Sequence, residues 1–459
     1  MADVPKNNSS KSGEVNPNQR DKPKVLPEST FRRTQRLASL PVGFAGRKAL
    51  GLGKRIGGQS AEMVSDQIKA RTAEQLFSTL GELKGGAMKL GQTLSVMEVA
   101  LPEETMAPYR EQLTKLQAAA PPMASEAVFQ IMEEELGSDW RDRFQEFNDE
   151  PAAAASIGQV HRGISSDGRD VAIKIQYPGA LQAIKSDFKQ MARLAKLFSI
   201  LAPGLDIKPL LRELEDRLTE ELDYIRESQA QRTFAAAYEG DPEFVIPHVL
   251  AAGPHVIVSE WIEGTQLSQL ITEGSKEERD HAGDLYFRFL LSGPARAGLL
   301  HADPHPGNYM ITPDGKLAVL DFGAHASLPD GFPPAIGRLI SVALEGKDSD
   351  EVVRGLRQEG FLKPQVKVNS LDVMDYFSPL IEPLRNEEFH FSREWIRAQF
   401  QRIRDPREGD LSLSVKFNMP PQYLLIHRVW MGSIAVLSQL DATIPARESA
   451  LEWVPAFTG

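Results

Sequence analysis

The segment His301–Asn308, together with the tripeptide that begins at Asp321, constrains this 459-residue chain more than any other feature. It places an Asp, an Asn five residues later and a second Asp eighteen residues after the first, at Asp303, Asn308 and Asp321. Each of these side chains carries an oxygen atom that can bind a cation or accept a hydrogen bond, and the Pro and Gly residues between them favour turns. Carboxylates and an amide on rigid turns can neutralise charge and keep reacting oxygens in line.

This spacing is that of the H-x-D-x-x-x-x-N loop and the D-F-G motif of kinases. The spacing predicts Asp303 as the catalytic residue that accepts a hydroxyl proton or positions a water, and Asn308 and Asp321 as ligands of Mg²⁺ on ATP. His301 and His305 are interpreted as hydrogen-bonding groups of the loop rather than proton donors. Two Asx-rich turns around a hairpin are the alternative, which the upstream motifs disfavour.

A lysine on a predicted strand forms the second motif. In Asp170–Lys174, which reads D-V-A-I-K, strand alternation puts Lys174 on one face with Ala172 and the apolar Val171 and Ile173 on the other. In kinases this lysine holds the α- and β-phosphates and pairs with a glutamate on a helix. Periodicity does not choose among five acidic candidates for that partner, which are Glu213, Glu215, Glu220, Glu221 and Glu227.

The loop expected over the phosphates is rich in alanine. Pro151–Val160 stands where kinases carry G-x-G-x-x-G, and alanine methyl groups restrict the close backbone approach that glycine allows. We therefore expect nucleotide binding to persist with the phosphates placed differently. Val258–Gly264 ends a strand and suits the segment whose backbone meets adenine. The predicted nucleotide contacts are Ala153, Ala154, Ala155, Ser156, Gln159, Lys174, Glu260 and Ile262.

The order of expected elements indicates an α+β fold with two lobes, like that of protein kinases, behind an N-terminal helical extension. Strands are expected at 143–148, 156–163, 170–177, 244–247 and 255–260. Helices dominate afterwards, apart from the catalytic segment and a strand at 316–320. The predicted domains are a disordered tail at 1–28, the extension at 29–124, an N-lobe at 125–262 and a C-lobe at 263–459.

Charge and composition exclude several classes of function. The net charge is −11, but residues 1–55 carry +8 and the remainder about −19. This basic leader could contact an anionic membrane. A solvated tail is the plainer interpretation of residues 1–28. The basic residues lack interleaved aromatics, which argues against nucleic acid. The chain has no cysteine, which excludes disulfides and thiol catalysis. Without a spanning apolar run or a signal-peptide core, we expect a cytoplasmic protein that is at most peripheral at a membrane.

Taken together, these motifs resemble the UbiB-like family of atypical kinases, also called the aarF domain-containing (ADCK-type) kinases, which includes the mitochondrial coenzyme Q kinases. The resemblance runs from about Thr30 to near Leu440. Lys89-Leu90-Gly91-Gln92 matches the family's K-x-G-Q motif, and Glu221-Leu222-Asp223 its E-x-D motif. Residues 153–161, 174–179 and 301–308 match its alanine-rich loop, the segment after the strand lysine and its catalytic loop.

The resemblance implies roles that spacing does not assign. Glu227 would be the partner of Lys174. Lys89 would reach into the place where a protein kinase binds peptide, held there by Glu221 and Asp223, with Gln92 completing its motif. The extension would then block protein phosphorylation. ATP (or ADP) and Mg²⁺ are the implied cofactors, and ATPase or unorthodox kinase activity in isoprenoid-quinone or lipid metabolism, near membranes, is the implied function. The expected partners are nucleotide, an anionic membrane surface and lipid or quinone intermediates, and a homodimer is left open.

The segment after Asp321-Phe322-Gly323 also argues against a protein substrate. No A-P-E follows it, and no peptide-docking platform is visible in the sequence. Some bacterial members carry C-terminal membrane helices, but none is evident here, so we expect peripheral contact only. Two alternatives remain. A small-molecule kinase of the aminoglycoside or choline type shares the catalytic loop, but the K-x-G-Q motif and the alanines argue against it. A nucleotide-gated scaffold is disfavoured, though not excluded, by the complete set of catalytic residues.

Overall fold

A computed structural model of the chain describes residues 122–155, 157–182, 222–346, 349–404, 417 and 420–458. The predicted tail and nearly all of the predicted extension lie outside this set. Four predicted site residues also lie outside it, namely Lys89, Gln92, Ser156 and Glu221.

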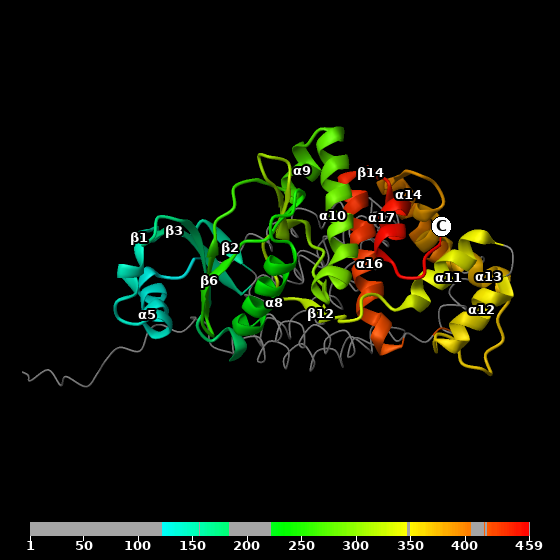
Figure 1. The fold of residues 1–459 in the computed structure, drawn as a ribbon, viewed down its shortest axis with the longest axis horizontal. Coiled ribbons are helices and arrows are strands. Elements are labelled where there is room, and N and C mark those ends of the chain that lie inside the picture. Colours follow the sequence, from blue (N-terminus) through cyan, green and yellow to red (C-terminus); the bar gives the residue numbers. More distant parts are fainter. Residues whose placement is uncertain are drawn as a thin grey trace, which may run out of the picture.

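A six-stranded antiparallel sheet occupies the first part of the described chain (Figure 1). Its order is β1 (Phe144–Phe147), β3 (Gly158–Ser165), β4 (Asp170–Gln176), β7 (Val256–Glu260) and β6 (Val249–Ala252), and β2 (Ala153–Ala155) pairs with β3. The alanine-rich segment predicted as a loop thus forms an edge strand, because Ala152 N donates to Val160 O at 2.8 Å and the pairing continues to Gly158. Alanine is a poor strand former alone, so the partner strand determines its conformation.

One face of this sheet packs on helix α5 (Ser125–Leu136) and the short helix η1 (Trp140–Arg143). Val171, Ile173 and Ile175 of β4 are buried there with Met132 and Trp140. Because side chains alternate along a strand, Lys174 and Ala172 lie on the opposite face, as predicted from the D-V-A-I-K pattern. The sheet register pairs Lys174 with Val160 and Ile257, whose side chains therefore share that face.

Helix α8 (Tyr224–Ala237) contacts β6 and β7 and begins at Asp223, whose side chain accepts a hydrogen bond from Arg226 N at 2.9 Å. An Asp at this position satisfies one of the free N–H groups of the first turn. Figure 1 shows α8 between the sheet and the helical half of the molecule. The predicted strand at 244–247 proves to be β5 (Phe244–Val245), which pairs with β11 in a second sheet rather than with the first.

The helical half is built on α10 (Lys276–Ala297), which begins with a capping box between Ser275 and Glu278 and ends at Gly298. Its buried side chains form one core with α16 (Pro421–Leu440) and α17 (Ala446–Trp453). Short elements lie before and after α10, and several of them flank the predicted catalytic segment at residues 301–323. These are β8 (Thr265–Gln266), α9 (Leu267–Glu273), β9 (Leu299–His301), η2 (Pro306–Asn308), β10 (Tyr309–Ile311), β11 (Leu317–Val319) and β12 (His325–Ser327).

An outer group of helices lies at the far end of the molecule from α5 (Figure 1). Helices α11 (Pro334–Glu345), α12 (Ser349–Gln358) and α13 (Ser370–Ile381) share a separate apolar cluster. The remaining elements are η3 (Glu382–Leu384), β13 (Phe389–His390), α14 (Arg393–Arg404) and β14 (Thr443–Ile444). Among the described helices, none combines the length and apolarity needed to cross a membrane. The architecture confirms the predicted α+β class with a kinase-like arrangement.

Candidate nucleotide site

Three charged side chains from distant parts of the chain meet in the described structure. Lys174 Nζ lies 2.6 Å from Glu227 Oε1 and 2.9 Å from Asp321 Oδ2. Strand β4 supplies the lysine, the first turn of α8 supplies Glu227, and the segment after β11 supplies Asp321. Side-chain exposure is 2% for Glu227, 16% for Lys174 and 31% for Asp321, so the group opens to solvent on the Asp321 side.

The electrostatics of this group keep the lysine charged. Burial of Lys174 disfavours its cation, but the carboxylates of Asp321 and Glu227 outweigh that cost and raise its pKa well above the usual value. The ring of Tyr224 lies 5.2 Å from Nζ and adds a cation–π contact. A fixed positive charge beside two carboxylates on separate elements is suited to holding phosphate oxygens.

The catalytic segment is tied to the Asp321 loop through His301. The Nε2 atom of His301 lies 2.6 Å from the carbonyl oxygen of Asp321, and Tyr309 Oη lies 2.9 Å from Nδ1. A carbonyl only accepts, so Nε2 carries the proton and Nδ1 accepts from the tyrosine hydroxyl. Backbone bonds from Leu320 N to Asn308 O and from Ala302 N to Ala324 O join the same two segments. His301 therefore links the segment 301–309 to the Asp321 loop through hydrogen bonds of both ring nitrogens.

Two buried tyrosines support this segment and were missed from the sequence. Tyr286 donates to Pro304 O at 2.9 Å, and Tyr309 Oη also lies 3.4 Å from Asp303 O. Burial raises the pKa of both phenols well above the usual value, so both remain donors. Tyr309 directly follows Asn308, an expected metal ligand, and could have been noticed by position. Tyr286 sits inside α10, where an aromatic residue normally indicates core.

The expected metal ligands fit a hard cation. Asn308 Nδ2 donates to Asp303 O at 3.4 Å, which leaves its amide oxygen for a ligand. Asp321 Oδ1 accepts from Gly323 N at 3.0 Å, while Oδ2 contacts Lys174. Mg²⁺ prefers such oxygens and is commonly bound by one or two carboxylates together with substrate phosphates. No cluster of three or more His, Asp or Glu side chains suited to a metal occurs in the described ranges, so phosphates and waters would complete the coordination.

Gln159 is placed away from the site. The register pairs it with Ile175, so its side chain lies on the α5 face of the sheet, opposite Lys174. It is 1% exposed, its Oε1 accepts from Met123 N at 2.7 Å, and its Nε2 lies 2.7 Å from Nε2 of His161. Both ends of the amide are thus engaged within the protein, on the face of the sheet opposite Lys174, and contact of Gln159 with nucleotide stays a prediction.

The other predicted nucleotide contacts lie at the edge of the sheet. Ala153 and Ala154 are exposed and Ala155 is partly buried. Glu260 ends β7 and its carboxylate accepts from His248 N at 3.0 Å, while Ile262 follows in a segment whose Trp261 N donates to Asp170 O. Contacts of these residues with nucleotide stay predictions.

Of the two predicted partners of Lys89, Asp223 lies within the described residues and Glu221 lies outside them. Asp223 is exposed and its side chain caps α8. Beside it, Arg226 Nη2 donates to His325 O at 3.2 Å, which links the start of α8 to strand β12 after the D-F-G motif. The predicted contact of Asp223 with Lys89 concerns a residue outside the described ranges.

Comparison with known proteins places these features in a family. The sequence model of the ABC1 atypical kinase-like domain matches residues 115–355. The chain is 27% identical to the mitochondrial atypical kinase COQ8 of Saccharomyces cerevisiae, over 91% of this chain and 83% of that protein. It is 27% identical to the mitochondrial atypical kinase COQ8B of Danio rerio, over 96% of this chain and 71% of that protein.

Two further relatives have higher identity. The chain is 31% identical to the chloroplastic protein ACTIVITY OF BC1 COMPLEX KINASE 3 of Arabidopsis thaliana, over 90% of this chain but only 55% of that protein. A solved structure, described as the complex of Rv3197 with erythromycin from Mycobacterium tuberculosis, is 41% identical. It superposes with a TM-score of 0.65 and covers 87% of this chain and 100% of that one. This chain belongs to the ABC1 atypical kinase-like family, the UbiB/ADCK family that includes the COQ8 atypical kinases.

Proposed function

We propose that the protein binds Mg-ATP and either hydrolyses it or transfers its γ-phosphoryl group, in support of isoprenoid-quinone or lipid metabolism. The observation that carries the proposal is the contact of Lys174 with both Glu227 and Asp321, at 2.6 and 2.9 Å. It joins the strand lysine, a helix glutamate and the D-F-G aspartate, which must act together in kinase-type phosphoryl transfer.

Each residue has a distinct task in this proposal. Lys174 exchanges its bond to Asp321 for one to the phosphates and stays oriented by Glu227. Asp303 accepts the proton of the attacking hydroxyl or positions the attacking water. Asn308 and Asp321 would hold Mg²⁺, which when bound neutralises charge on the phosphate oxygens. The hydrogen bonds of His301 and Tyr309 keep the two loops in register before nucleotide arrives.

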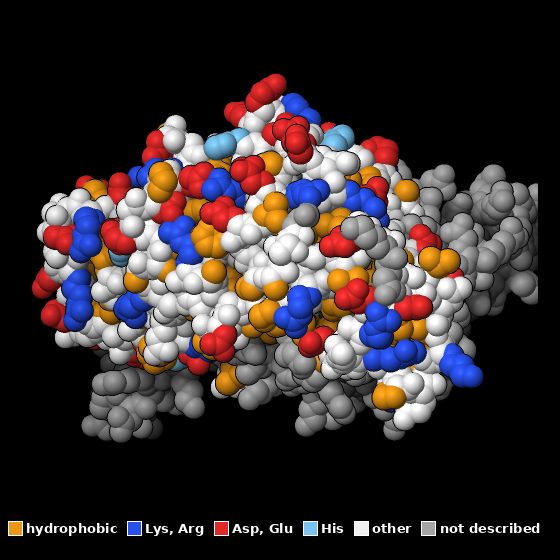
Figure 2. Space-filling model, turned by 45° about the vertical axis from the view of Figure 1, so that its right-hand side comes forward, with side chains coloured by type: hydrophobic (Ala, Val, Ile, Leu, Met, Phe, Trp, Pro, Cys, Tyr) orange, Lys and Arg blue, Asp and Glu red, His pale blue; other side chains and the backbone are white. Residues whose placement is uncertain are grey.

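The expected substrate is not a protein. No A-P-E platform follows the D-F-G motif, and the curated relatives include proteins named as COQ8 atypical kinases. Relatives named as mitochondrial or chloroplastic support a setting close to membranes. On the face shown in Figure 2, acidic and basic side chains of described residues are interspersed, so membrane contact would use another face or the basic residues 1–55.

ATP turnover by the purified full-length protein tests this proposal. We expect Mg²⁺-dependent turnover that rises with vesicles containing anionic phospholipid and is lost in Asp321→Asn. Asp330→Asn is the matched control, because it makes the same charge change at an exposed residue nine positions later. Wild-type protein that binds Mg-ATP but never turns it over, with or without vesicles, would instead support the nucleotide-gated scaffold. Direct phosphorylation of an added alcohol or amine metabolite would favour the small-molecule kinase.

A second candidate function is binding of a macrolide-type ligand. It is supported by the 41% identity to the protein whose structure is described as a complex with erythromycin. Calorimetric titration of erythromycin into the full chain tests it directly. Saturable binding supports the candidate, and its absence at the highest soluble concentration removes it without affecting the ATP proposal.

A further inference from the structure

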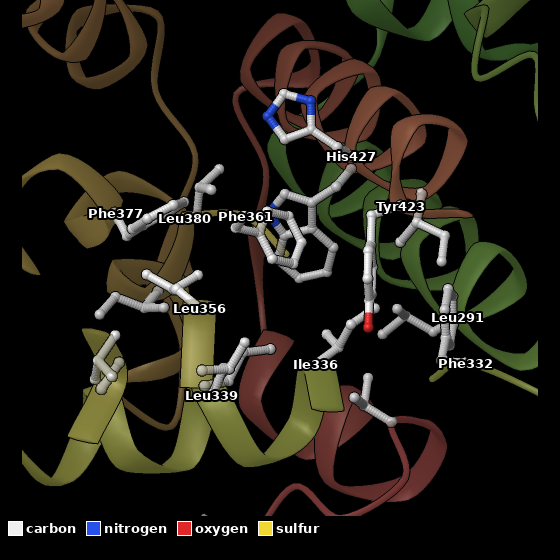
Figure 3. Close-up of a pocket in the computed structure, with 17 residues that line it drawn as sticks. Leu291, Phe332, Ile336, Leu339, Leu356, Phe361, Phe377, Leu380, Tyr423 and His427 are labelled. Carbon is white, nitrogen blue, oxygen red and sulfur yellow. The ribbon is translucent and has the colours of Figure 1, made fainter. Parts of the chain in front are cut away.

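We propose that an apolar cavity among the outer helices binds the hydrocarbon chain of a small amphipathic molecule, at a site separate from the nucleotide residues. The cavity has a volume of about 190 Å³ and lies between α10, α11, α12, α13 and α16 (Figure 3). Its walls include Ile336, Leu339, Leu356, Phe377, Tyr423 and Trp430.

The wall chemistry disfavours water as the occupant. Nearly all lining side chains are aliphatic or aromatic, and the hydroxyl of Tyr423 already donates to Glu359 Oε2 at 2.6 Å. The cavity is partly open to solvent, and water inside it would find few of the roughly two to four polar partners that a buried water needs. The described walls therefore suit a ligand that makes dispersion contacts rather than hydrogen bonds.

The size suits part of a hydrocarbon. Protein interiors are close-packed, and wall atoms that face a void lose contacts that an apolar ligand restores. An engineered apolar cavity of roughly 150 Å³ binds benzene. At about 190 Å³ this cavity holds one ring or a short run of a chain, such as the terminal units of an isoprenoid or an acyl group.

One polar group stands at the edge of the cavity. His427 lies one helical turn after Tyr423 on α16, so both belong to the same face of the helix, and His427 is exposed. In Figure 3 its ring lies apart from the aliphatic side chains of α11 and α12. An occupant with its chain inside and a polar end at His427 matches this layout. An isoprenoid alcohol and a fatty alcohol share that chemistry.

Helix α16 connects the cavity to the catalytic loop. Trp430 lines the cavity and packs edge-on against Phe287, with ring centroids 5.6 Å apart. Two residues later, a Cβ atom added to Gly432 would lie 2.5 Å from Cγ of Pro304, which follows Asp303. An occupant that shifts α16 therefore presses on the loop that carries Asp303. Binding itself does not depend on the proposed ATP chemistry; only its effect on turnover rests on that function.

The test uses the full chain and short alcohols. Isothermal calorimetry with geraniol and with 1-octanol measures the affinity, and 8-bromo-1-octanol should quench the fluorescence of Trp430 at contact distance. We expect saturable binding and quenching that falls in Trp430→Phe. Ala343→Leu and Ile336→Phe fill the cavity from two positions on α11 and should weaken binding at least tenfold. Gln358→Leu adds a leucine on the exposed end of α12 and should leave the affinity unchanged.

Specific outcomes decide the proposal. Tighter binding of geraniol or of octanol identifies the chain type as isoprenoid or acyl. Binding must persist in Asp321→Asn, so a protein without ATP turnover can still support the cavity. Absence of saturable binding, or equal affinity in wild type and in folded cavity-filling variants, overturns the proposal. Loss of self-association in those variants, without alcohol binding in wild type, would show that a second copy of the chain covers the cavity.

Discussion

Tyr309 Oη lies 2.9 Å from Nδ1 of His301, and the other ring nitrogen of that histidine lies 2.6 Å from the carbonyl oxygen of Asp321. The two bonds run in series from strand β10, beside Asn308, to the D-F-G aspartate. They join the proposed base loop to the proposed metal loop without using either functional carboxylate. A tyrosine with no assigned chemical role therefore sets the relative position of residues that have one.

Tyr309→Phe should slow ATP turnover about tenfold with little change in KM for ATP. The substitution removes the hydroxyl but keeps the ring that packs against Tyr286 at 4.9 Å. It leaves Nδ1 of a buried histidine without this donor, a cost of about 1–3 kcal/mol, and a tenfold rate change corresponds to about 1.4 kcal/mol. Steady-state kinetics measure the effect, with Tyr376→Phe in the outer helices as control. A larger change in KM than in kcat would contradict a positioning role.

Lys174→Met should destabilise the fold by roughly 3 kcal/mol, because it leaves the carboxylates of Glu227 and Asp321 together without the lysine cation. The raised pKa of Lys174 also sets a pH dependence. A lysine whose pKa rises on folding contributes stability that is fully present below its unfolded pKa of about 10.4 and lost above it, as pH passes through the folded value.

Urea unfolding between pH 7 and 11 measures both effects. We expect wild-type stability to include an alkaline loss that is smaller in Lys174→Met. Lys316→Met is the control, since that ammonium donates to the carbonyl of Asp241 and not to a carboxylate. An identical alkaline slope in wild type and in Lys174→Met would refute the coupling.

A pair of substitutions should separate stability from nucleotide binding. Gln159→Leu removes the acceptor for Met123 N and the partner of His161, so it should cost about 1–3 kcal/mol in unfolding free energy without a specific effect on ATP affinity. Ala154→Gly changes an exposed position on the edge strand and should alter nucleotide affinity with little change in stability. Thermal unfolding and nucleotide titration measure both properties. Lower ATP affinity in Gln159→Leu without a loss of stability would show that Gln159 contacts nucleotide.

Sequence spacing was sufficient where a motif is local. The alternation of Asp170–Lys174 correctly placed Lys174 on the face of β4 opposite Val171 and Ile173, and H-x-D-x-x-x-x-N followed by D-F-G predicted two loops that the structure ties together. Local pattern did not show that Ala153–Ala155 forms a strand, because alanine has no strand preference of its own and pairing with β3 determines it.

Contacts between distant segments were beyond local reasoning. Periodicity left five acidic residues open, and Glu227 was singled out only by family resemblance before the structure brought it to Lys174. The orientation of Gln159 required the register of β3 against β4, which sequence alone does not provide. The cavity arises from helices whose apolar residues look like ordinary core, so only their arrangement in space shows an unfilled volume.

Gly432→Ala should lower turnover several-fold while nucleotide affinity changes little. A methyl group at this position would lie 2.5 Å from Cγ of Pro304, too close for a carbon–carbon contact, so either the proline ring or α16 must shift. Since Pro304 follows Asp303 directly, that shift displaces the proposed base rather than the phosphate-binding Lys174. Single-turnover kinetics and ATP titration measure the two effects, and Leu424→Ala, an exposed change on the same helix, is the control. Turnover of ATP by Gly432→Ala at the wild-type rate would show that the contact of α16 with Pro304 does not affect catalysis. In that case, binding in the cavity could not alter turnover through this helix.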